Sequence, residues 1–161
     1  MATKGEISAA ILRGNRDVQQ VFGGLTDTQL DTPAQQDGGT WTVGDILGHL
    51  AGREQVYAMM YQAAHGDDPF AAISDFGVWN EARVVERRGD ARDDLLAEFR
   101  AVHEALLAQV EATDDAELAQ TVTLGARQAT LGDLLLGSGG QHSTSHATEV
   151  ASVLGMEAPA A

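Results

Sequence analysis

Two of the five histidines, His142 and His146, lie four residues apart near the carboxyl end of the chain. We predict a helix in this segment, and residues four apart share one face of a helix, one turn from each other. Such a pair of imidazoles can bind a divalent metal ion. Ser143 stands where the HExxH motif of metalloproteases carries glutamate, so the pair is not part of that motif. Two surface or capping histidines are the alternative.

A third histidine, His49, belongs to another predicted helix and lies on the side of Leu50 and Val56. An imidazole that points into a protein core must find a polar partner, because its burial otherwise costs free energy. A lone inward histidine is usually a hydrogen-bonded core residue. A metal ion held by three neutral nitrogens, with one position left open, would satisfy His49, His142 and His146 together. We therefore predict these three as metal ligands.

The other two histidines are predicted to lie outside this site. His65 precedes Gly66 at the end of a predicted helix, where it complements the helix dipole. We expect it to be structural or solvent-exposed. His103 lies between Val102 and Glu104, off the predicted apolar stripe of its helix, and we predict a surface position.

Three charged residues near the predicted ligands are candidates for supporting roles. Arg53, one turn after His49, could hold a carboxylate of a thiol or substrate. A solvated or salt-bridged arginine is the alternative. Asp45, one turn before His49, could orient that imidazole, although capping of the helix is the favoured interpretation. Glu149, three residues after His146, could support that ligand or act as a base, and a surface glutamate is the favoured alternative.

Helices must position these side chains, because apolar residues recur at helical spacing through most of the chain. Long helices are predicted at about 4–22, 42–64, 91–112 and 130–155. Between them we expect a polar loop at 26–40 containing Gly38-Gly39, a shorter helix or irregular segment at about 74–88, and an extended or irregular segment at 119–129. This pattern predicts an all-α four-helix bundle with one longer crossover connection.

The apolar stripes and the helix starts support this assignment. The stripe of the first helix consists of Ile7, Ile11, Val18 and Phe22, and that of the third consists of Leu95, Phe99, Val102, Leu106 and Val110. Thr42 with Asp45, and Thr130 with Asp133, resemble capping boxes in which aspartate replaces glutamate. We expect one domain over residues 1–161, with its core at about 5–155 and a loose tail at 156–161.

The composition limits the chemistry. The chain has no cysteine, which excludes disulfides, thiolate metal sites and a cysteine nucleophile. The formal net charge is −14, and we expect such an acidic protein to bind neither nucleic acid nor anionic membranes. The first residues, from Met1 to Glu6, lack the features of a secretory signal. We therefore expect a cytoplasmic protein.

Three segments resemble the DinB-like superfamily. They are Trp41-Thr-Val-Gly-Asp45-Ile-Leu-Gly-His49-Leu-Ala, Phe76-Gly-Val-Trp79-Asn80-Glu81 with Arg87-Arg88, and His142-x-x-x-His146. Their order and separations agree over about residues 5–155. The resemblance implies a four-helix bundle with a divalent metal, often zinc or nickel, and places its ligands at His49, His142 and His146. It also implies a homodimer.

The superfamily includes bacillithiol and mycothiol S-transferases, mycothiol-dependent maleylpyruvate isomerases, and resistance proteins that hydrolyse reactive natural products. The resemblance therefore implies a bacterial, detoxifying, metal-dependent transferase that joins a low-molecular-weight thiol to a small electrophile. With one lysine, nine arginines and many Ala and Gly residues, the composition is typical of a GC-rich genome and favours mycothiol over bacillithiol. The alternatives are a hydrolase that protects against a reactive natural product and a non-catalytic bundle that binds a small molecule.

Overall fold

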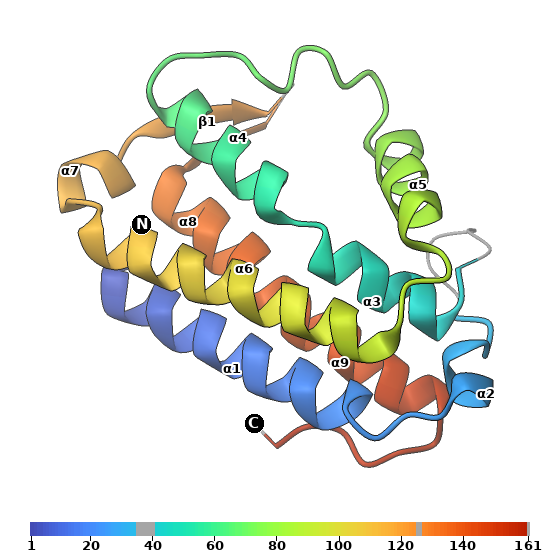
Figure 1. Ribbon diagram of the computed structural model, residues 1–161. Coiled ribbons are helices and arrows are strands. Elements are labelled where there is room, and N and C mark those ends of the chain that lie inside the picture. Colours follow the sequence, from blue (N-terminus) through green and yellow to red (C-terminus); the bar gives the residue numbers. More distant parts are fainter. Residues whose placement is uncertain (35–40, 125–126, 161) are drawn as a thin grey trace.

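The computed structural model describes residues 1–34, 41–124 and 127–160, and it confirms the mostly helical four-helix bundle. Four lines of helix form the bundle (Figure 1). They are α1 (Lys4–Phe22), α3 (Val43–Ala51) followed by α4 (Glu54–Ala64), α6 (Arg92–Ala112), and the series α8 (Leu131–Leu135), η1 (Leu136–Gln141) and α9 (His142–Val153). Helix α1 packs against α6, η1 and α9, and α3 packs against α6. None of the described helices is long and apolar enough to cross a membrane.

The predicted second helix is interrupted. Thr42 and Asp45 form the expected capping box at the start of α3, but this helix ends at Ala51 and α4 begins at Glu54. The guanidinium of Arg87 lies against Gly52 at the break, where a Cβ atom would come 3.1 Å from Arg87 Cζ. Glycine therefore allows this close approach. The break is a tertiary effect, because Arg87 belongs to a different helix.

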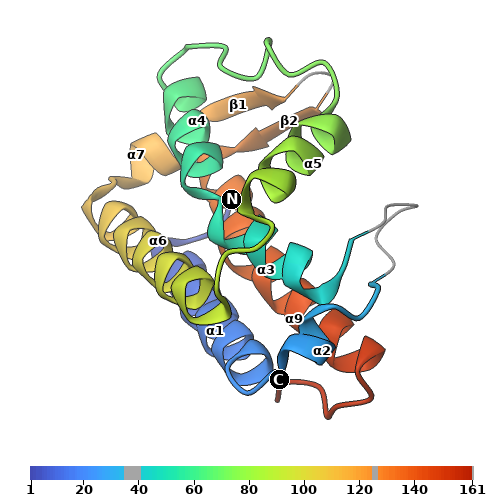
Figure 2. The ribbon, with the colours of Figure 1, turned by 45° about the vertical axis from the view of Figure 1, so that its right-hand side comes forward.

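Short elements fill the connections. They are α2 (Asp27–Leu30), α5 (Phe76–Arg87), α7 (Asp115–Leu118), β1 (Thr121–Leu124) and β2 (Arg127–Thr130). Helix α2 lies within the segment predicted as a polar loop, and Gly38-Gly39 of that loop lies outside the described residues. The segment predicted as extended or irregular, 119–129, contains β1 and most of β2, which pair antiparallel, and β1 lies beside α4 (Figure 2).

The last predicted helix contains a π-helical segment, η1, between α8 and α9. Two of its glycines, Gly139 and Gly140, pack closely against α1. A Cβ atom on Gly140 would overlap the backbone of Ala10, and one on Gly14 would come 2.8 Å from Gly140 O. A π-turn is wider than an α-turn, so it changes the rotational phase between α8 and α9. The segment thereby sets the direction in which His142 and His146 project.

The stripe on α1 is buried as predicted, whereas the stripe on α6 differs at one position. Leu95, Phe99, Leu106 and Val110 are buried, but Val102 is only partly buried. His103 is 0% exposed, so the prediction of a surface position was wrong. The spacing explains this result, because residue 103 lies one turn after Phe99 and continues the stripe towards Leu106.

Candidate metal centre

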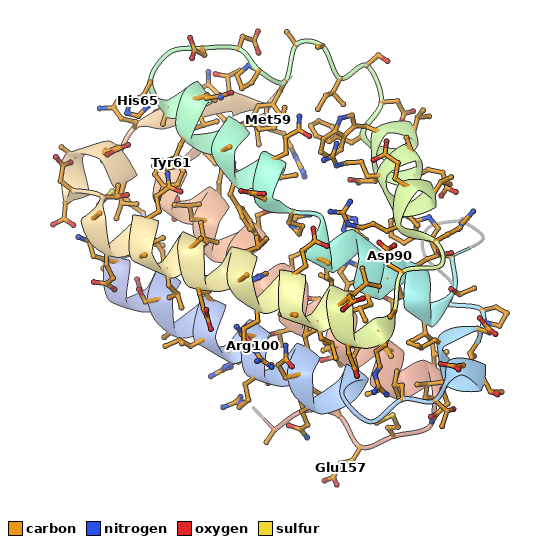
Figure 3. All side chains as sticks on the ribbon, viewed as in Figure 1. Met59, Tyr61, His65, Asp90, Arg100 and Glu157 are labelled. Atoms are coloured by element: carbon orange, nitrogen blue, oxygen red, sulfur yellow. The ribbon has the colours of Figure 1, made fainter. Side chains whose placement is uncertain are left out.

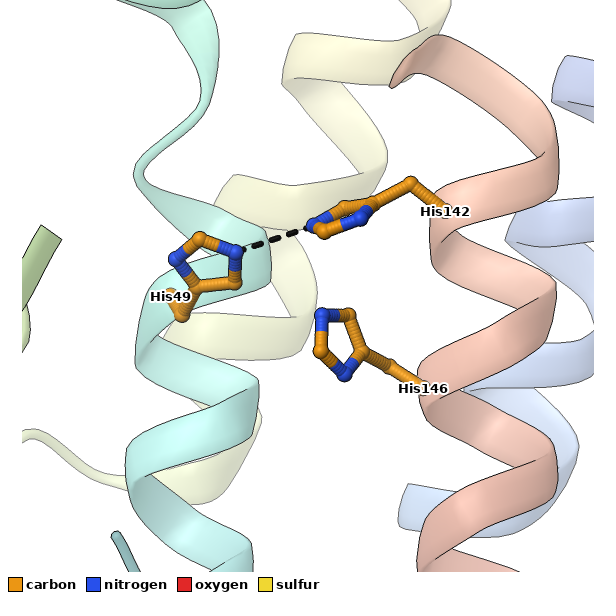
Figure 4. A group of neighbouring side chains, drawn as sticks. All are labelled: His49, His142 and His146. Carbon is orange, nitrogen blue, oxygen red and sulfur yellow. Dashed lines mark hydrogen bonds between the residues drawn. The ribbon is translucent and has the colours of Figure 1, made fainter. Parts of the chain in front are cut away.

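Three imidazoles converge between α3 and α9 (Figure 4). One ring nitrogen from each of His49, His142 and His146 lies within 4.8 Å of the other two. The Nε2 atoms of His49 and His142 are 2.9 Å apart, and the ring centroids of His142 and His146 are 4.4 Å apart. The structure thus brings together the three residues that the spacing and the resemblance predict as ligands.

Burial keeps these imidazoles neutral. It lowers the pKa of His49 to about 3, and the nearby Arg53 guanidinium acts in the same direction. Burial also lowers the pKa of His142, again with help from Arg53, and it lowers the pKa of His146. At pH 7 each ring therefore has one nitrogen lone pair available to a metal ion.

The donor set fits a divalent metal. Neutral histidine nitrogens are ordinary ligands of zinc and nickel. Two nitrogens bound to one tetrahedral zinc ion at about 2.0–2.1 Å lie about 3.3 Å apart. The 2.9 Å between the Nε2 atoms of His49 and His142 is close to this value, so a small shift of the two rings would fit them to an ion.

Glu149 lies beside one of the candidate ligands. Its Oε2 is 3.3 Å from Nδ1 of His146. A carboxylate only accepts, so His146 donates from Nδ1 and its Nε2 keeps the lone pair. A partner of this kind fixes both the tautomer and the orientation of a metal-binding histidine. This contact favours a role for Glu149 in orienting His146, whereas the sequence favoured a surface glutamate without such a role.

Asp45 makes the contacts of a helix cap. Its carboxylate accepts a hydrogen bond from the Thr42 backbone N–H, and Arg88 donates to it at 2.9 Å. Arg88 also binds Glu81, which accepts a hydrogen bond from Trp41 Nε1. These contacts join α5 to the start of α3, and the Trp41 ring lies 5.1 Å from that of His49. The motif residues around positions 41, 81 and 88 therefore serve to fix the helix that carries His49.

Arg53 is buried beside the histidines, with only 8% of its surface exposed. Its Nη1 is 3.3 Å from Nε2 of His142, and its Nη2 donates to the hydroxyl of Ser138 in η1. The position at the break between α3 and α4 directs this side chain inward. This excludes the solvated alternative, and no carboxylate among the described residues pairs with it.

A buried polar network that the sequence did not reveal lies next to this site. His103 Nδ1 is 2.9 Å from the Phe99 carbonyl oxygen, and its Nε2 faces the hydroxyls of Ser143 at 3.4 Å and Tyr57 at 3.5 Å. The Tyr57 hydroxyl donates to the Ser138 carbonyl at 3.2 Å. The regular spacing along α6 was the signal that could have identified His103. His65, by contrast, lies at the far end of α4 (Figure 3), where it is exposed and contacts Glu117.

The chain belongs to the family described as the mycothiol maleylpyruvate isomerase N-terminal domain, which matches residues 12–136. Two solved structures have the same fold. YfiT from Bacillus subtilis, described as a probable metal-dependent hydrolase with an unusual four-helix bundle topology, is 22% identical with a TM-score of 0.74, and the match covers 96% of this chain and 89% of YfiT. The colibactin self-resistance protein ClbS is 16% identical with a TM-score of 0.77, and the match covers 98% of this chain and 99% of ClbS. No curated protein matches the chain in sequence.

The ClbS structure corrects one prediction from the sequence. ClbS was solved in complex with double-stranded DNA. A protein of this fold can therefore bind nucleic acid, and the exclusion of nucleic-acid partners was wrong. The physical reason is that net charge is a sum over the whole molecule, whereas phosphate contacts depend on the local arrangement of basic groups and backbone N–H donors.

Proposed function

We propose that the protein is a metal-dependent enzyme that transfers a low-molecular-weight thiol, mycothiol or bacillithiol, to a small electrophile. The convergence of three neutral imidazoles from α3 and α9, at buried or partly buried positions, is the observation that carries the proposal. Three histidine ligands leave a position open, which is typical of catalytic rather than structural sites. The absence of cysteine means that the thiol comes from a small molecule.

The residues of the chain have separable tasks in this mechanism. His49, His142 and His146 would hold zinc or nickel, which when bound lowers the pKa of a thiol or of water and so supplies a nucleophile at neutral pH. Glu149 holds the proton on Nδ1 of His146 and keeps its Nε2 directed into the site. The thiol sulfur attacks an electrophilic carbon: the new C–S bond forms as the bond from that carbon to its leaving group breaks, the leaving group departs with the bonding electrons, and the thiol proton passes to solvent.

The first test measures metal content. We expect about one zinc or nickel ion per chain by mass spectrometry of untagged protein, because a three-histidine site holds one ion. His49→Ala and His142→Ala should each lose the metal, whereas His65→Ala, which alters an exposed histidine, should keep it. Protein that takes up no metal even after incubation with zinc and nickel would exclude the proposal.

The second test addresses the reaction. The metal-loaded protein is incubated with monochlorobimane and with each thiol in turn, and conjugate formation is followed by fluorescence. We expect metal-dependent conjugation of monochlorobimane with mycothiol or, as the alternative, with bacillithiol. If neither thiol is conjugated in a metal-dependent reaction, the transferase assignment fails.

A hydrolase is the second candidate function. The descriptions of YfiT as a probable metal-dependent hydrolase and of ClbS as a self-resistance protein favour it. The same three imidazoles could serve, because the nucleophile would be water in place of a thiol. Loss of a reactive electrophile without added thiol distinguishes this reaction from the transfer. A bundle that only sequesters a small molecule would bind the electrophile and leave it unchanged.

A further inference from the structure

Arg53 is a buried cation without an anionic partner among the described residues. The chain has 24 acidic residues and 10 basic ones, so carboxylates are plentiful. Arg87 pairs with Glu98 at 2.5 Å and Arg88 pairs with Asp45 at 2.9 Å. Arg53 is more deeply buried than either, yet no carboxylate oxygen of the described chain lies within 4 Å of it. Burial of a charge without a counter-charge is costly.

The contacts of Arg53 leave part of its guanidinium unused. Its Nη2 donates to Ser138, and its Nη1 faces Nε2 of His142. Its Nε is buried and has no hydrogen-bond partner. A guanidinium presents five N–H donors in a planar fork that matches an anionic group. The remaining donor capacity of Arg53 thus lies directly beside the candidate metal ligands.

A second arginine, Arg83, lines the same small cavity as Arg53. Arg83 of α5 stacks over the ring of Trp79 at 4.5 Å, and its Nε is also buried without a partner. His49, Arg53, Trp79, Asn80 and Arg83 line a small cavity of about 10 Å³. A cavity of this size holds a group about as large as a water molecule. It therefore admits the end of a ligand rather than the whole molecule.

We propose that Arg53 and the metal centre together bind one anionic group of a ligand, a thiolate or a carboxylate. The part of this inference that involves the metal ion rests on the proposed function. The three imidazoles are neutral and bring no negative charge, so a dication beside Arg53 adds to the positive charge already buried there. An anionic donor atom placed between them offsets both charges and accepts charge-assisted hydrogen bonds from Arg53.

Probe binding to the cobalt-loaded protein tests the inference. Acetate and 2-mercaptoethanol are titrated at constant ionic strength, and the visible cobalt absorption reports their binding. We expect Arg53→Met to weaken binding about tenfold or more, because it removes charge-assisted hydrogen bonds. Arg53→Lys keeps the positive charge but lacks the planar set of N–H donors, so its affinity for the probes should lie between those of the wild type and Arg53→Met. Arg13→Gln is the matched control, because it removes an exposed positive charge on α1, and it should leave both affinities unchanged.

The outcomes separate this inference from the proposed function. If Arg53→Met weakens the binding of acetate but not of 2-mercaptoethanol, the anionic group of the ligand is a carboxylate. If it weakens only the binding of 2-mercaptoethanol, the group is a thiolate. Equal affinities in the wild type, Arg53→Met and Arg53→Lys would overturn the inference while leaving the metal site intact. If the wild type takes up none of cobalt, zinc and nickel, the proposed function fails, and the melting temperature of the metal-free proteins in acetate decides the role of Arg53. If acetate raises the melting temperature of the wild type but not that of Arg53→Met, the inference is supported. If acetate changes both melting temperatures equally, the inference is overturned.

Discussion

Glu149 fixes the proton of His146, and this contact has a measurable consequence. Its carboxylate lies 3.3 Å from Nδ1, on the side of the ring away from the lone pair that faces the other histidines. We predict that Glu149→Ala weakens zinc binding about 10- to 100-fold, the usual effect of losing such a partner. Glu149→Gln should recover part of the affinity, because its amide oxygen can accept the same hydrogen bond.

Competition with a chromophoric zinc chelator measures this change. Glu104→Ala is the matched control, because it removes an exposed glutamate from α6. Equal affinities in Glu149→Ala and Glu104→Ala would show that Glu149 does not support the ligand.

His103 joins α6 to α9 beside the candidate metal site. A carbonyl only accepts, so His103 donates from Nδ1 to Phe99, and its Nε2 accepts. The Tyr57 proton goes to the Ser138 carbonyl, which leaves the hydroxyl of Ser143 to donate to His103. We predict that His103→Phe lowers the free energy of unfolding by about 1–3 kcal/mol, because it leaves a buried hydroxyl without its acceptor.

Urea unfolding of the metal-free protein measures this loss. His65→Phe, at an exposed position, should change the free energy of unfolding by less than about 0.5 kcal/mol. A His103→Phe variant as stable as the wild type would show that these long hydrogen bonds contribute nothing.

The sequence indicates which side chains share one face of a helix, but it does not show the contacts that distant segments make with that face. Spacing alone placed His142 and His146 on one face. The prediction that His103 lies at the surface places the stripe on Val102, whereas the buried face of α6 runs through His103. The inward direction of Arg53 could not be predicted, since it depends on the helix break and on Ser138 of a distant segment.

The π-helical segment η1 connects the packing against α1 with the direction in which His142 and His146 project. Within η1, Gly140 has no room for a side chain against Ala10, whereas a Cβ atom on Gly137 would meet nothing within 4 Å. We predict that Gly140→Ala lowers the free energy of unfolding by about 1–3 kcal/mol, the usual cost of an overpacked contact. It should also lower zinc affinity, because displacement of η1 moves His142.

Gly137→Ala provides a matched control in the same segment. It introduces the same methyl group without a clash, so it should be close to neutral. Thermal unfolding and zinc competition, measured on both variants, give the comparison. Equal stabilities would show that η1 and α1 separate easily and that the glycine contact does not set the direction of α9.

Helix starts were predictable, whereas interruptions of helices were not. The capping box at Thr42 and the side-chain cap at Thr130 are local signals, and α3 and α8 begin directly after them. The break at Gly52 depends on Arg87 of α5, and the π-turn depends on the close approach of α1. Both features come from contacts between distant segments, so the periodic pattern predicted continuous helices through them.

At the scale of the whole molecule, buried neutral histidines make stability depend on pH. Burial lowers the pKa of His49, His103, His142 and His146 in the folded protein. Below about pH 6.5 the unfolded chain therefore binds more protons at these positions than the folded protein does. Stability from these groups is complete above that pH and is lost as the pH falls.

We predict that the free energy of unfolding of the metal-free protein falls between about pH 8 and about pH 5.5, by about 1.4 kcal/mol for each histidine that stays neutral when folded. Urea unfolding in EDTA at the two pH values measures the fall. His103→Phe has one buried histidine fewer, so its fall should be smaller by about 1.4 kcal/mol. An equal fall in both proteins would show that His103 takes up a proton in the folded state. Constant stability in the wild type would show that these four histidines have the same pKa in the folded and the unfolded protein, which contradicts the prediction.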